Sequence, residues 1–227
     1  MVSIIKLTWC QNKCSKGAIM PKGSPELTAS RRNEIIRACE KLYQTMGFKQ
    51  ITLKQVGDVT SFSRPTIYNY FETKEEIFLA LFEEEYERWN ADLEKILQEN
   101  EELSKGQLAD MIATSLSERP QLLKLLSMNN FDMEENSREE CLTSFKRAYG
   151  RSLKLVRSIL DKFCPEMSEE RKQRFLYAFF PFMFGIYPYT AVTEKQKNAM
   201  REAKVDYIYQ SIYEITCNCI TDLLKNE

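Results

Sequence analysis

The residues best suited to binding chemistry lie together in the stretch TSFSRPTIYNYFETKEE, residues 60–76. Positions 64–70 hold an arginine, a proline, a threonine, an asparagine and two tyrosines, with only one aliphatic residue among them. Such side chains suit contact with a nucleic acid, because a short helix in a major groove about 12 Å wide must offer polar atoms to bases and phosphates. A solvated helix edge is the alternative interpretation.

The rest of the composition argues against catalysis and metal binding. The chain has no histidine, which removes Ser-His-Asp and Cys-His catalysis and every histidine-based metal site. Its seven cysteines are an odd number without a framework of tight spacings, which is typical of reduced thiols in the cytoplasm. Cys217 and Cys219 would point about 200° apart on a helix, so they cannot easily hold one ion. We therefore expect a cytoplasmic protein that is not an enzyme and has no metal or cofactor.

Helices are expected to position these residues, because the sequence as a whole predicts an all-α chain. Glycine and proline are sparse, β-branched alternation is rare, and no apolar run is long enough to span a bilayer. Thr52 with Gln55, and Thr73 with Glu76, have the spacing of capping boxes that open a short and a long helix. Another short helix is expected from the N-cap Ser63 to about residue 70. The other helices are expected at about 30–46, 106–117, 120–130, 137–163, 168–190 and 196–225.

Local charge supports the interpretation of the two short helices as a helix-turn-helix. The whole chain has a net charge of −1, so it is not a bulk polycation. Between Met20 and Lys74, however, nine basic and five acidic side chains leave a net charge of +4, and the next helix turns acidic at FEEEYERW. A basic segment ahead of an acidic body places the expected DNA-binding face at the N-terminal end.

These residues resemble the DNA-binding segment of the tetracycline-repressor (TetR/AcrR) family of bacterial regulators. The family pattern is a threonine opening the second helix, a turn, a serine, and then Thr-Leu-Tyr-x-Tyr/His-Phe-x-x-Lys-Glu; this chain reads ITLKQVGDVTSFSRPTIYNYFETKEEIF. Gly57 stands where the family has a small residue in the second helix. Thr60 and Ser61 replace the usual Ala-Gly of the turn. We therefore expect Ser61 to take the place of the turn glycine, at positive φ.

The resemblance implies a role for each polar residue of the segment. Base-edge contacts are implied for Arg64, Pro65 and Asn69, since an arginine can pair with guanine and a proline can touch a thymine methyl group. Contacts with the phosphate backbone are implied for a second set, which fixes position on the DNA without reading its sequence. This set is Thr52, Thr66, Tyr68, Tyr70 and Lys74.

We divide the chain into a tail, a helix-turn-helix DNA-binding domain and a helical domain for ligand binding and dimerisation. These cover residues 1–27, 28–88 (with the helix-turn-helix at about 51–70) and 89–227. The first nineteen residues, MVSIIKLTWCQNKCSKGAI, lack a clean apolar core and a small-residue cleavage site, so a signal peptide is not expected. They form a tail in one interpretation. In the other, translation starts at Met20, because the codons for the preceding Lys-Gly-Ala can spell a ribosome-binding sequence.

The aromatic residues of the C-terminal part allow two interpretations. Those between positions 175 and 189 fall on all sides of one expected helix, which indicates plain core and dimer interface. Proteins of the family bind an inducer between such helices, and Pro181 should kink the helix and could open a cavity. Aromatic and methionine side chains would suit an apolar or aromatic ligand of unknown identity. The candidate ligand-binding residues are Trp89, Phe131, Phe145, Tyr149, Tyr177, Phe180 and Met183.

The expected function is that of a homodimeric repressor that a small-molecule ligand releases from a palindromic operator. In one state, two recognition helices about 34–36 Å apart would bind double-stranded DNA; the ligand would favour another spacing. The alternative is a DNA-binding regulator without a small-molecule ligand, controlled by a protein partner. No membrane contact is expected. An apolar stripe on the last expected helix is assigned to the dimer interface: Val205, Ile208, Ile212, Ile215 and Cys219.

Overall fold

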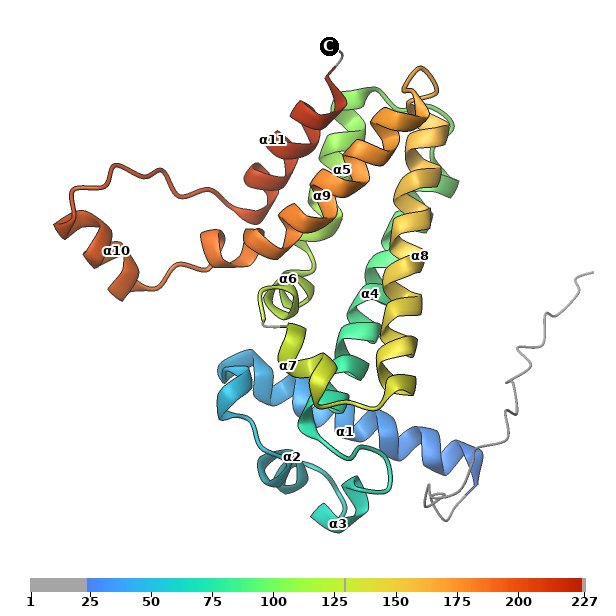
Figure 1. Ribbon diagram of the computed structural model, residues 1–227, viewed down its shortest axis with the longest axis vertical. Coiled ribbons are helices and arrows are strands. Elements are labelled where there is room, and N and C mark those ends of the chain that lie inside the picture. Colours follow the sequence, from blue (N-terminus) through green and yellow to red (C-terminus); the bar gives the residue numbers. More distant parts are fainter. Residues whose placement is uncertain (1–23, 129, 226–227) are drawn as a thin grey trace, which may run out of the picture.

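The computed structural model describes residues 24–128 and 130–225, and all regular elements in these residues are helical (Figure 1). The all-α prediction is therefore confirmed. Most of the expected tail, including Met20, lies outside the described residues. The elements are α1 (Pro25–Thr45), η1 (Phe48–Gln50), α2 (Leu53–Val59), α3 (Arg64–Ile67), α4 (Lys74–Glu99), α5 (Lys105–Ser117), α6 (Pro120–Leu126), α7 (Asn130–Glu135), α8 (Glu139–Phe163), α9 (Glu169–Thr190), α10 (Glu194–Glu202) and α11 (Ile212–Leu224).

The helices α1, α2 and α3 form a small head at one end of the molecule (Figure 1). Ile35, Ile36 and Cys39 recur at helical spacing on α1, and all three side chains are buried. They belong to the same buried cluster as Val56 of α2 and Ile67 of α3. A helix as short as α3 is not stable alone, so its orientation depends on this packing.

One unbroken helix, α4, connects the head to the body. Near its start, the ring of Phe78 lies edge-on to Tyr43 of α1 and to Phe48 of η1, with centroids 5.1 Å and 4.8 Å apart. Further along, Trp89 and Leu93 are buried in the body. Because both parts of the protein share α4, a displacement of this helix in the body would move the head as well.

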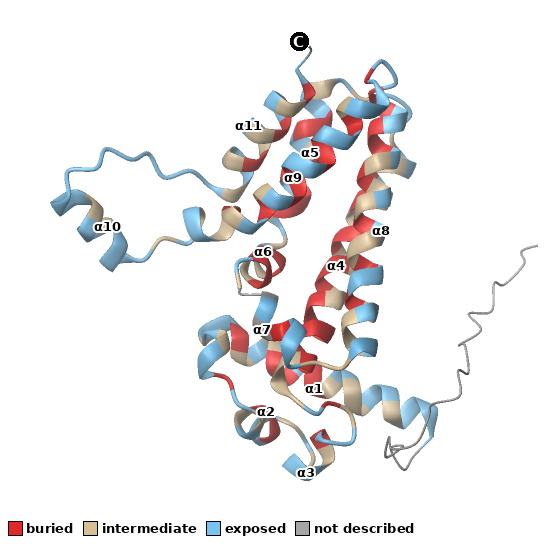
Figure 2. Ribbon diagram, viewed as in Figure 1, coloured by how far each residue is buried: buried red, intermediate tan, exposed pale blue. Residues whose placement is uncertain are grey.

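In the body, α4 packs along α8, and α5 packs along α11 (Figure 1). The buried residues of α4 and α8 face each other, as Figure 2 shows. The Asn90 amide donates a hydrogen bond to the Ala148 carbonyl at 3.1 Å, and the Ser152 hydroxyl donates to Asn90 Oδ1 at 2.6 Å. Both polar side chains are fully buried, so these bonds fix the register of α4 against α8.

The helix expected at 196–225 is broken in the structure, so the prediction of one continuous helix is wrong. α10 ends where Lys204 takes a left-handed backbone conformation, with φ of 54°. The N–H of Val205 then donates to the Met200 carbonyl at 3.0 Å, which completes a Schellman motif. The chain continues without helix until Ser211, which caps the start of α11.

Two other expectations concern the helices around the body. The helix expected at 120–130 ends early, at Leu126, and a separate helix, α7, begins at Asn130. α9 keeps its helical conformation through Pro181 and Pro188, both of which are exposed. Each proline lacks an N–H, so the carbonyl four residues before it loses its usual helical partner. No single described helix has the length and apolar composition needed to cross a bilayer; α9 and α10 meet these criteria only as a pair bent by 85°.

Candidate nucleic-acid interface

The local sequence at Thr52 explains where α2 begins. Its side-chain oxygen accepts a hydrogen bond from the N–H of Gln55 at 3.3 Å, and Gln55 Oε1 accepts one from the N–H of Thr52 at 2.9 Å. The predicted capping box is therefore confirmed. Thr52 itself is exposed at the beginning of the helix.

The crossing of α2 and α3 depends on Gly57. A Cβ atom at this position would lie 3.3 Å from Cβ and 3.4 Å from Cα of Arg64, which is closer than most such contacts. The absence of a side chain therefore lets the first turn of α3 approach the α2 backbone. Ile67, one turn further along α3, lies on the same face, with its Cδ1 atom 3.5 Å from that Cβ position. Its side chain is fully buried and holds the short helix in the core of the head.

The turn between α2 and α3 is held by side-chain hydrogen bonds. The N–H of Ser61 donates to Glu34 Oε1 at 2.5 Å, and its hydroxyl donates to Glu34 Oε2 at 3.1 Å. The Thr60 hydroxyl lies 2.9 Å from the Gly57 carbonyl. Lys204 is the only non-glycine among the described residues with positive φ, so the expectation of positive φ at Ser61 is wrong. The Glu34 carboxylate on α1 binds this turn instead.

The polar edge of α3 faces solvent. Arg64, Pro65, Tyr68 and Asn69 are exposed, whereas Thr66 is half-buried. The Arg64 guanidinium donates to the Tyr68 hydroxyl at 3.2 Å and lies 5.9 Å from the centre of its ring. The structure thus brings the predicted base-edge residues onto one exposed surface above a buried apolar edge.

The two remaining predicted phosphate contacts lie just after α3. Tyr70 is half-buried, and its carbonyl accepts a hydrogen bond from Arg138 at 3.3 Å. The Lys74 ammonium donates to the carbonyl of Phe48 at 3.0 Å and lies 4.2 Å from the centre of the Phe48 ring. An ammonium has three donors, so Lys74 keeps donors for a phosphate in this position.

The capping box expected at Thr73 and Glu76 is only half formed, because Glu76 has other partners. The N–H of Glu76 donates to Thr73 Oγ1 at 3.2 Å, but the Glu76 carboxylate accepts from the N–H of Glu72 at 2.8 Å. It also accepts from Arg138 Nε at 2.7 Å and Nη2 at 2.9 Å. Burial alone would raise the pKa of Glu76, but these hydrogen bonds hold it below its ordinary value.

A second buried carboxylate, Glu85, links α4 to α1 and α6. Burial raises the pKa of this group, although Arg88 pairs with it. Arg88 also donates to Glu40 of α1 at 2.9 Å. The Gln121 amide of α6 donates to Glu40 at 3.3 Å and to Glu85 at 3.4 Å. Side chains from the head and the body therefore meet at the middle of α4.

The body also contacts α1 of the head directly through α6. The Tyr43 hydroxyl donates to the carbonyl of Lys124 at 3.2 Å. In return, the Lys124 ammonium donates to the carbonyl of Tyr43 and lies 4.0 Å from the centre of its ring. This reciprocal pair joins residues far apart in the sequence, so no local pattern predicts it.

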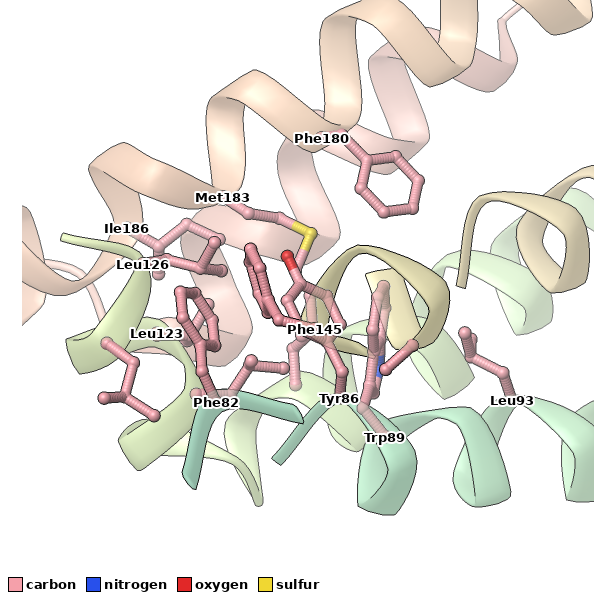
Figure 3. Close-up of a cluster of buried hydrophobic side chains, with 14 of the residues drawn as sticks. Phe82, Tyr86, Trp89, Leu93, Leu123, Leu126, Phe145, Phe180, Met183 and Ile186 are labelled. Atoms are coloured by element: carbon pink, nitrogen blue, oxygen red, sulfur yellow. The ribbon is translucent and has the colours of Figure 1, made fainter. Parts of the chain in front are cut away.

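Five of the seven candidate ligand-binding residues come together in the body. Trp89 and Phe180 have ring centroids 6.1 Å apart, and Phe180 and Tyr149 have centroids 5.6 Å apart. Figure 3 shows Met183 pointing from α9 toward Phe145. The Trp89 indole also donates to the hydroxyl of a buried serine at 3.1 Å. The rings fill the space between α4, α8 and α9 as a packed aromatic cluster.

The other two candidate ligand-binding residues lie outside this cluster. Phe131 is 75% exposed and Tyr177 is 73% exposed. Tyr177 faces away from the cluster because it lies on the outer side of α9, where it lines a surface hollow of about 570 Å³ between α8 and α9 with Leu153 and Leu176. The all-round aromatic pattern of α9 thus combines a buried face with an exposed one.

The expected dimer stripe does not form one surface. Val205 and Ile208 are exposed in the segment between α10 and α11, whereas Ile212 and Ile215 are half-buried against the core of their own chain. Burial raises the pKa of Cys219 to about 11, so this thiol stays protonated at neutral pH. The prediction of a single stripe was wrong because it placed all five residues on one continuous helix, and the structure has no helix between α10 and α11.

The sequence interpretation assigned the aromatic residues of α9 to the core and the dimer interface, but it did not separate an exposed apolar stripe from the buried face. Tyr177, Pro181, Phe184 and Pro188 follow one another at spacings of three and four residues, and all four are exposed. An exposed apolar helix face of this kind needs a partner surface. The signal was present in the sequence, but the inward-facing aromatics between these positions hid it.

Two family models together match most of the described chain, from the middle of α1 to the end of the segment after α10. The model described as "Bacterial regulatory proteins, tetR family" matches residues 35–81. The model described as "Tetracyclin repressor-like, C-terminal domain" matches residues 83–209, which is more than half of the chain. The first covers the head with the helix-turn-helix, and the second covers the body through α10.

Curated relatives match about a third of this chain. The HTH-type transcriptional repressor Rv1474c of Mycobacterium tuberculosis is 31% identical over 72 residues, which cover 32% of this chain and 38% of that protein. The uncharacterized HTH-type transcriptional regulator YfiR of Bacillus subtilis is 35% identical over 63 residues, which cover 28% of this chain and 31% of that protein. The chain thus matches little more than a third of the length of these relatives.

Solved structures of regulators share the overall fold. The fatty acid degradation regulator FadR from Bacillus halodurans superimposes with a TM-score of 0.55 over 89% of this chain and 96% of that chain. The MbdR regulator from Azoarcus sp. CIB gives a TM-score of 0.50 over 85% and 96%. Both are 15% identical to this chain, so these likenesses concern the fold alone. On its helix-turn-helix head and its two family matches, the chain belongs to the tetracycline-repressor family of bacterial transcriptional regulators, which are DNA-binding proteins and not enzymes.

Proposed function

We propose that this protein is a dimeric repressor that binds a palindromic operator through two copies of α3 and is released by a small apolar or aromatic ligand. The observation that carries the DNA-binding part is the exposed edge of α3, with Arg64, Pro65 and Asn69 above the buried Ile67. A repressor role is supported by the relative from Mycobacterium tuberculosis, which is named as a transcriptional repressor. Its place of action would be the cytoplasm, where the DNA is.

The α9 stripe supports the proposal of a homodimer. Tyr177, Pro181, Phe184 and Pro188 offer an exposed apolar face that a second α9 can cover. Gly185 lies beside this stripe without a close neighbour, so a partner helix can approach the backbone there. With α11 alongside α9, a two-fold axis at this face would place two heads side by side. Half-sites about 34–36 Å apart would match that arrangement.

The aromatic cluster of the body supports the ligand proposal. Trp89, Tyr149 and Phe180 come from three different helices, α4, α8 and α9. A ligand that separates these rings must move α4, and α4 carries the head. The Glu40–Arg88–Glu85–Gln121 group would then change as well, because it joins α1, α4 and α6 around the same helix. A ligand that binds the displaced arrangement better would shift the population away from the DNA-binding spacing.

The alternative function, a DNA-binding regulator controlled by a protein partner, is favoured by one observation. Trp89 and Met183 are fully buried, and the rings between them already occupy the proposed ligand site. If the cluster stays filled in solution, a signal must reach the head through the surface of the body instead. A partner protein would then bind an exposed face and act on α4 from outside.

The DNA-binding part is tested by footprinting the promoter next to the gene. We expect protection of a palindrome with half-sites one helical turn apart, and a stoichiometry of two chains per site in sedimentation with the protected duplex. A footprint on a single asymmetric half-site, with one chain bound, would refute the palindromic dimer. No sequence-specific footprint at any salt concentration would refute the operator-binding proposal.

The ligand part is tested with a panel of apolar and aromatic compounds in a thermal-shift assay. A true inducer should raise the melting temperature, release the operator and change the fluorescence of Trp89, whose indole donates to Ser115 at 3.1 Å. The measurement uses a Trp9→Phe variant, so that Trp89 is the only tryptophan. A compound that releases DNA while the emission of Trp89 stays constant would place the site elsewhere. A Phe180→Ala variant provides a second check, since it should weaken ligand binding.

A further inference from the structure

The segment between α9 and α11 extends away from the body as an arm (Figure 1). We call residues 191–211 the α10 arm. None of its residues is buried, and residues 203–211 are exposed throughout (Figure 2). A segment of this length without a buried residue receives almost no packing energy from its own subunit.

The α10 arm nevertheless has an ordered internal structure. Thr193 caps α10, its side chain accepting from the N–H of Gln196 at 3.2 Å. The Schellman motif at Lys204 turns the chain back along α10. The ring of Tyr207 then lies 6.5 Å from Tyr189 at the end of α9 and 5.1 Å from Tyr209. Local bonds of this kind lower the ordering cost when a surface binds a partner.

The surface of the α10 arm is apolar where the chain returns toward α11. Ile208 is 83% exposed, and Val205, Tyr207 and Tyr209 are all more than a third exposed. The returning chain and α10 leave between them a hollow of about 460 Å³. Its lining combines Met200, Val205, Tyr207 and Tyr209 with the charged residues Glu194, Lys197, Arg201 and Asp206. A large exposed apolar surface beside a hollow of this size is typical of an interaction site.

The occupant that best fits the arm is a second copy of this chain. The arm begins directly after α9, whose exposed last turn, with Pro188 and Tyr189, adjoins the α9 stripe of the proposed dimer and contacts Tyr207 of the arm. A stable interface uses about 20–30 residues from each partner, which is more than one helix face supplies. We infer that the α10 arm reaches across the dimer and packs Val205 and Ile208 against the partner subunit. This inference rests on the proposed homodimer, and the two-fold axis makes the contact occur twice.

The test measures the dimer dissociation constant by sedimentation equilibrium for the full chain and three variants. Ile208→Asp should raise the constant at least about tenfold, because each dimer then buries two carboxylates where it buried two isoleucines. The side chain is almost free of contacts in its own subunit, so the fold should be unaffected, which circular dichroism checks. Leu27→Asp is the matched control, since Leu27 is also an exposed aliphatic residue (43%) but lies on α1. Phe184→Asp tests the α9 stripe separately.

The outcomes separate the arm from the dimer itself. If Phe184→Asp dissociates the dimer while Ile208→Asp matches the Leu27→Asp control, the arm does not contribute and the inference is overturned, but the dimer stands. If the unmodified protein is a monomer at all concentrations, the proposed dimer fails first. If Ile208→Asp leaves the dimer intact but removes binding to anionic lipid vesicles, the arm faces a membrane and the inference is again overturned. A photo-cross-linker at position 208 should give inter-subunit products; products only within one chain would contradict it.

Discussion

Replacing Arg138 by methionine should destabilise the fold by isolating a buried charge. Arg138 gives the Glu76 carboxylate two hydrogen bonds, at 2.7 Å and 2.9 Å, and that carboxylate is only 1% exposed. Breaking a buried ion pair typically costs about 3–5 kcal/mol. The Arg138 side chain is 32% exposed, so water partly screens the pair, and we expect a loss of about 2–3 kcal/mol. Methionine keeps the length of the side chain but removes its charge.

The loss should depend on pH in a defined direction. In the unmodified protein the pKa of Glu76 is lowered, so its contribution to stability is present above the unfolded value and is lost as pH falls through the folded one. Without the Arg138 guanidinium, only the backbone N–H groups of residues 72 and 138 still offset burial, so the folded pKa of Glu76 should rise well above its value in the unmodified protein. The variant is then least affected below about pH 4, where the carboxyl is protonated in both states. Its deficit should grow as pH rises toward 7.

Urea unfolding at several pH values measures both effects, with Arg138→Met/Glu76→Gln as the matched control. The neutral amide removes the isolated charge, so the double variant should recover more than half of the lost free energy of unfolding. A double variant as unstable as Arg138→Met would refute the electrostatic explanation. A deficit of equal size at pH 4 and pH 7 would refute it as well, because lost packing does not titrate.

Three further predictions concern the head. Arg64→Ala should relax base preference at one position of each half-site by about 1–3 kcal/mol. Lys74→Ala should instead lower the affinity for all DNA sequences alike, and should reduce the slope of log affinity against log salt concentration by about one unit. Binding to single-base operator variants at several salt concentrations tests both. Gly57→Val should cost about 1–3 kcal/mol of stability in urea unfolding because its methyl groups meet the α3 backbone, and a neutral result would contradict the close crossing. Glu34→Ala should lower stability by about 1 kcal/mol and reduce affinity without changing base preference, since its carboxylate holds the turn at Ser61; altered preference in an operator-variant assay would contradict this role.

The parts of the head that follow from short-range rules could be predicted from the sequence. The cap at Thr52, the short helix after Ser63 and the exposed edge with Arg64 all depend on residues a few positions apart. The family pattern indicated a small residue at position 57. The structure gives the physical reason, since a Cβ atom there would lie 3.3 Å from Cβ of Arg64. The turn at Ser61 could not be predicted, because its partner Glu34 lies on another helix.

The predictions that were wrong concern features that depend on contacts between distant segments, or on a local signal that was overlooked. Arg138 joins α4 through tertiary packing, so nothing near Glu76 in the sequence indicates that the capping box is half formed. By contrast, the break before α11 had a local signal: Ser211 and Glu214 have capping-box spacing, and the structure contains that reciprocal cap. A period of three and four residues cannot by itself detect such a break. The three-and-four-residue period continues to match apolar residues through the break, where Ile208 lies, and beyond it.

The buried amide of Asn90 restricts how α4 can move. A slide by one helical turn, about 5.4 Å, would separate it from Ala148 and Ser152 and leave its polar atoms without partners in an apolar seam. A small rotation about Asn90 would keep these bonds, which makes this residue the expected pivot. Lys74 lies sixteen residues away, about 24 Å along the axis, and a tilt of about 5° would therefore carry it about 2 Å. Under the proposed ligand mechanism, a disturbance of the rings next to the pivot would thereby become a sideways swing of the DNA-binding end.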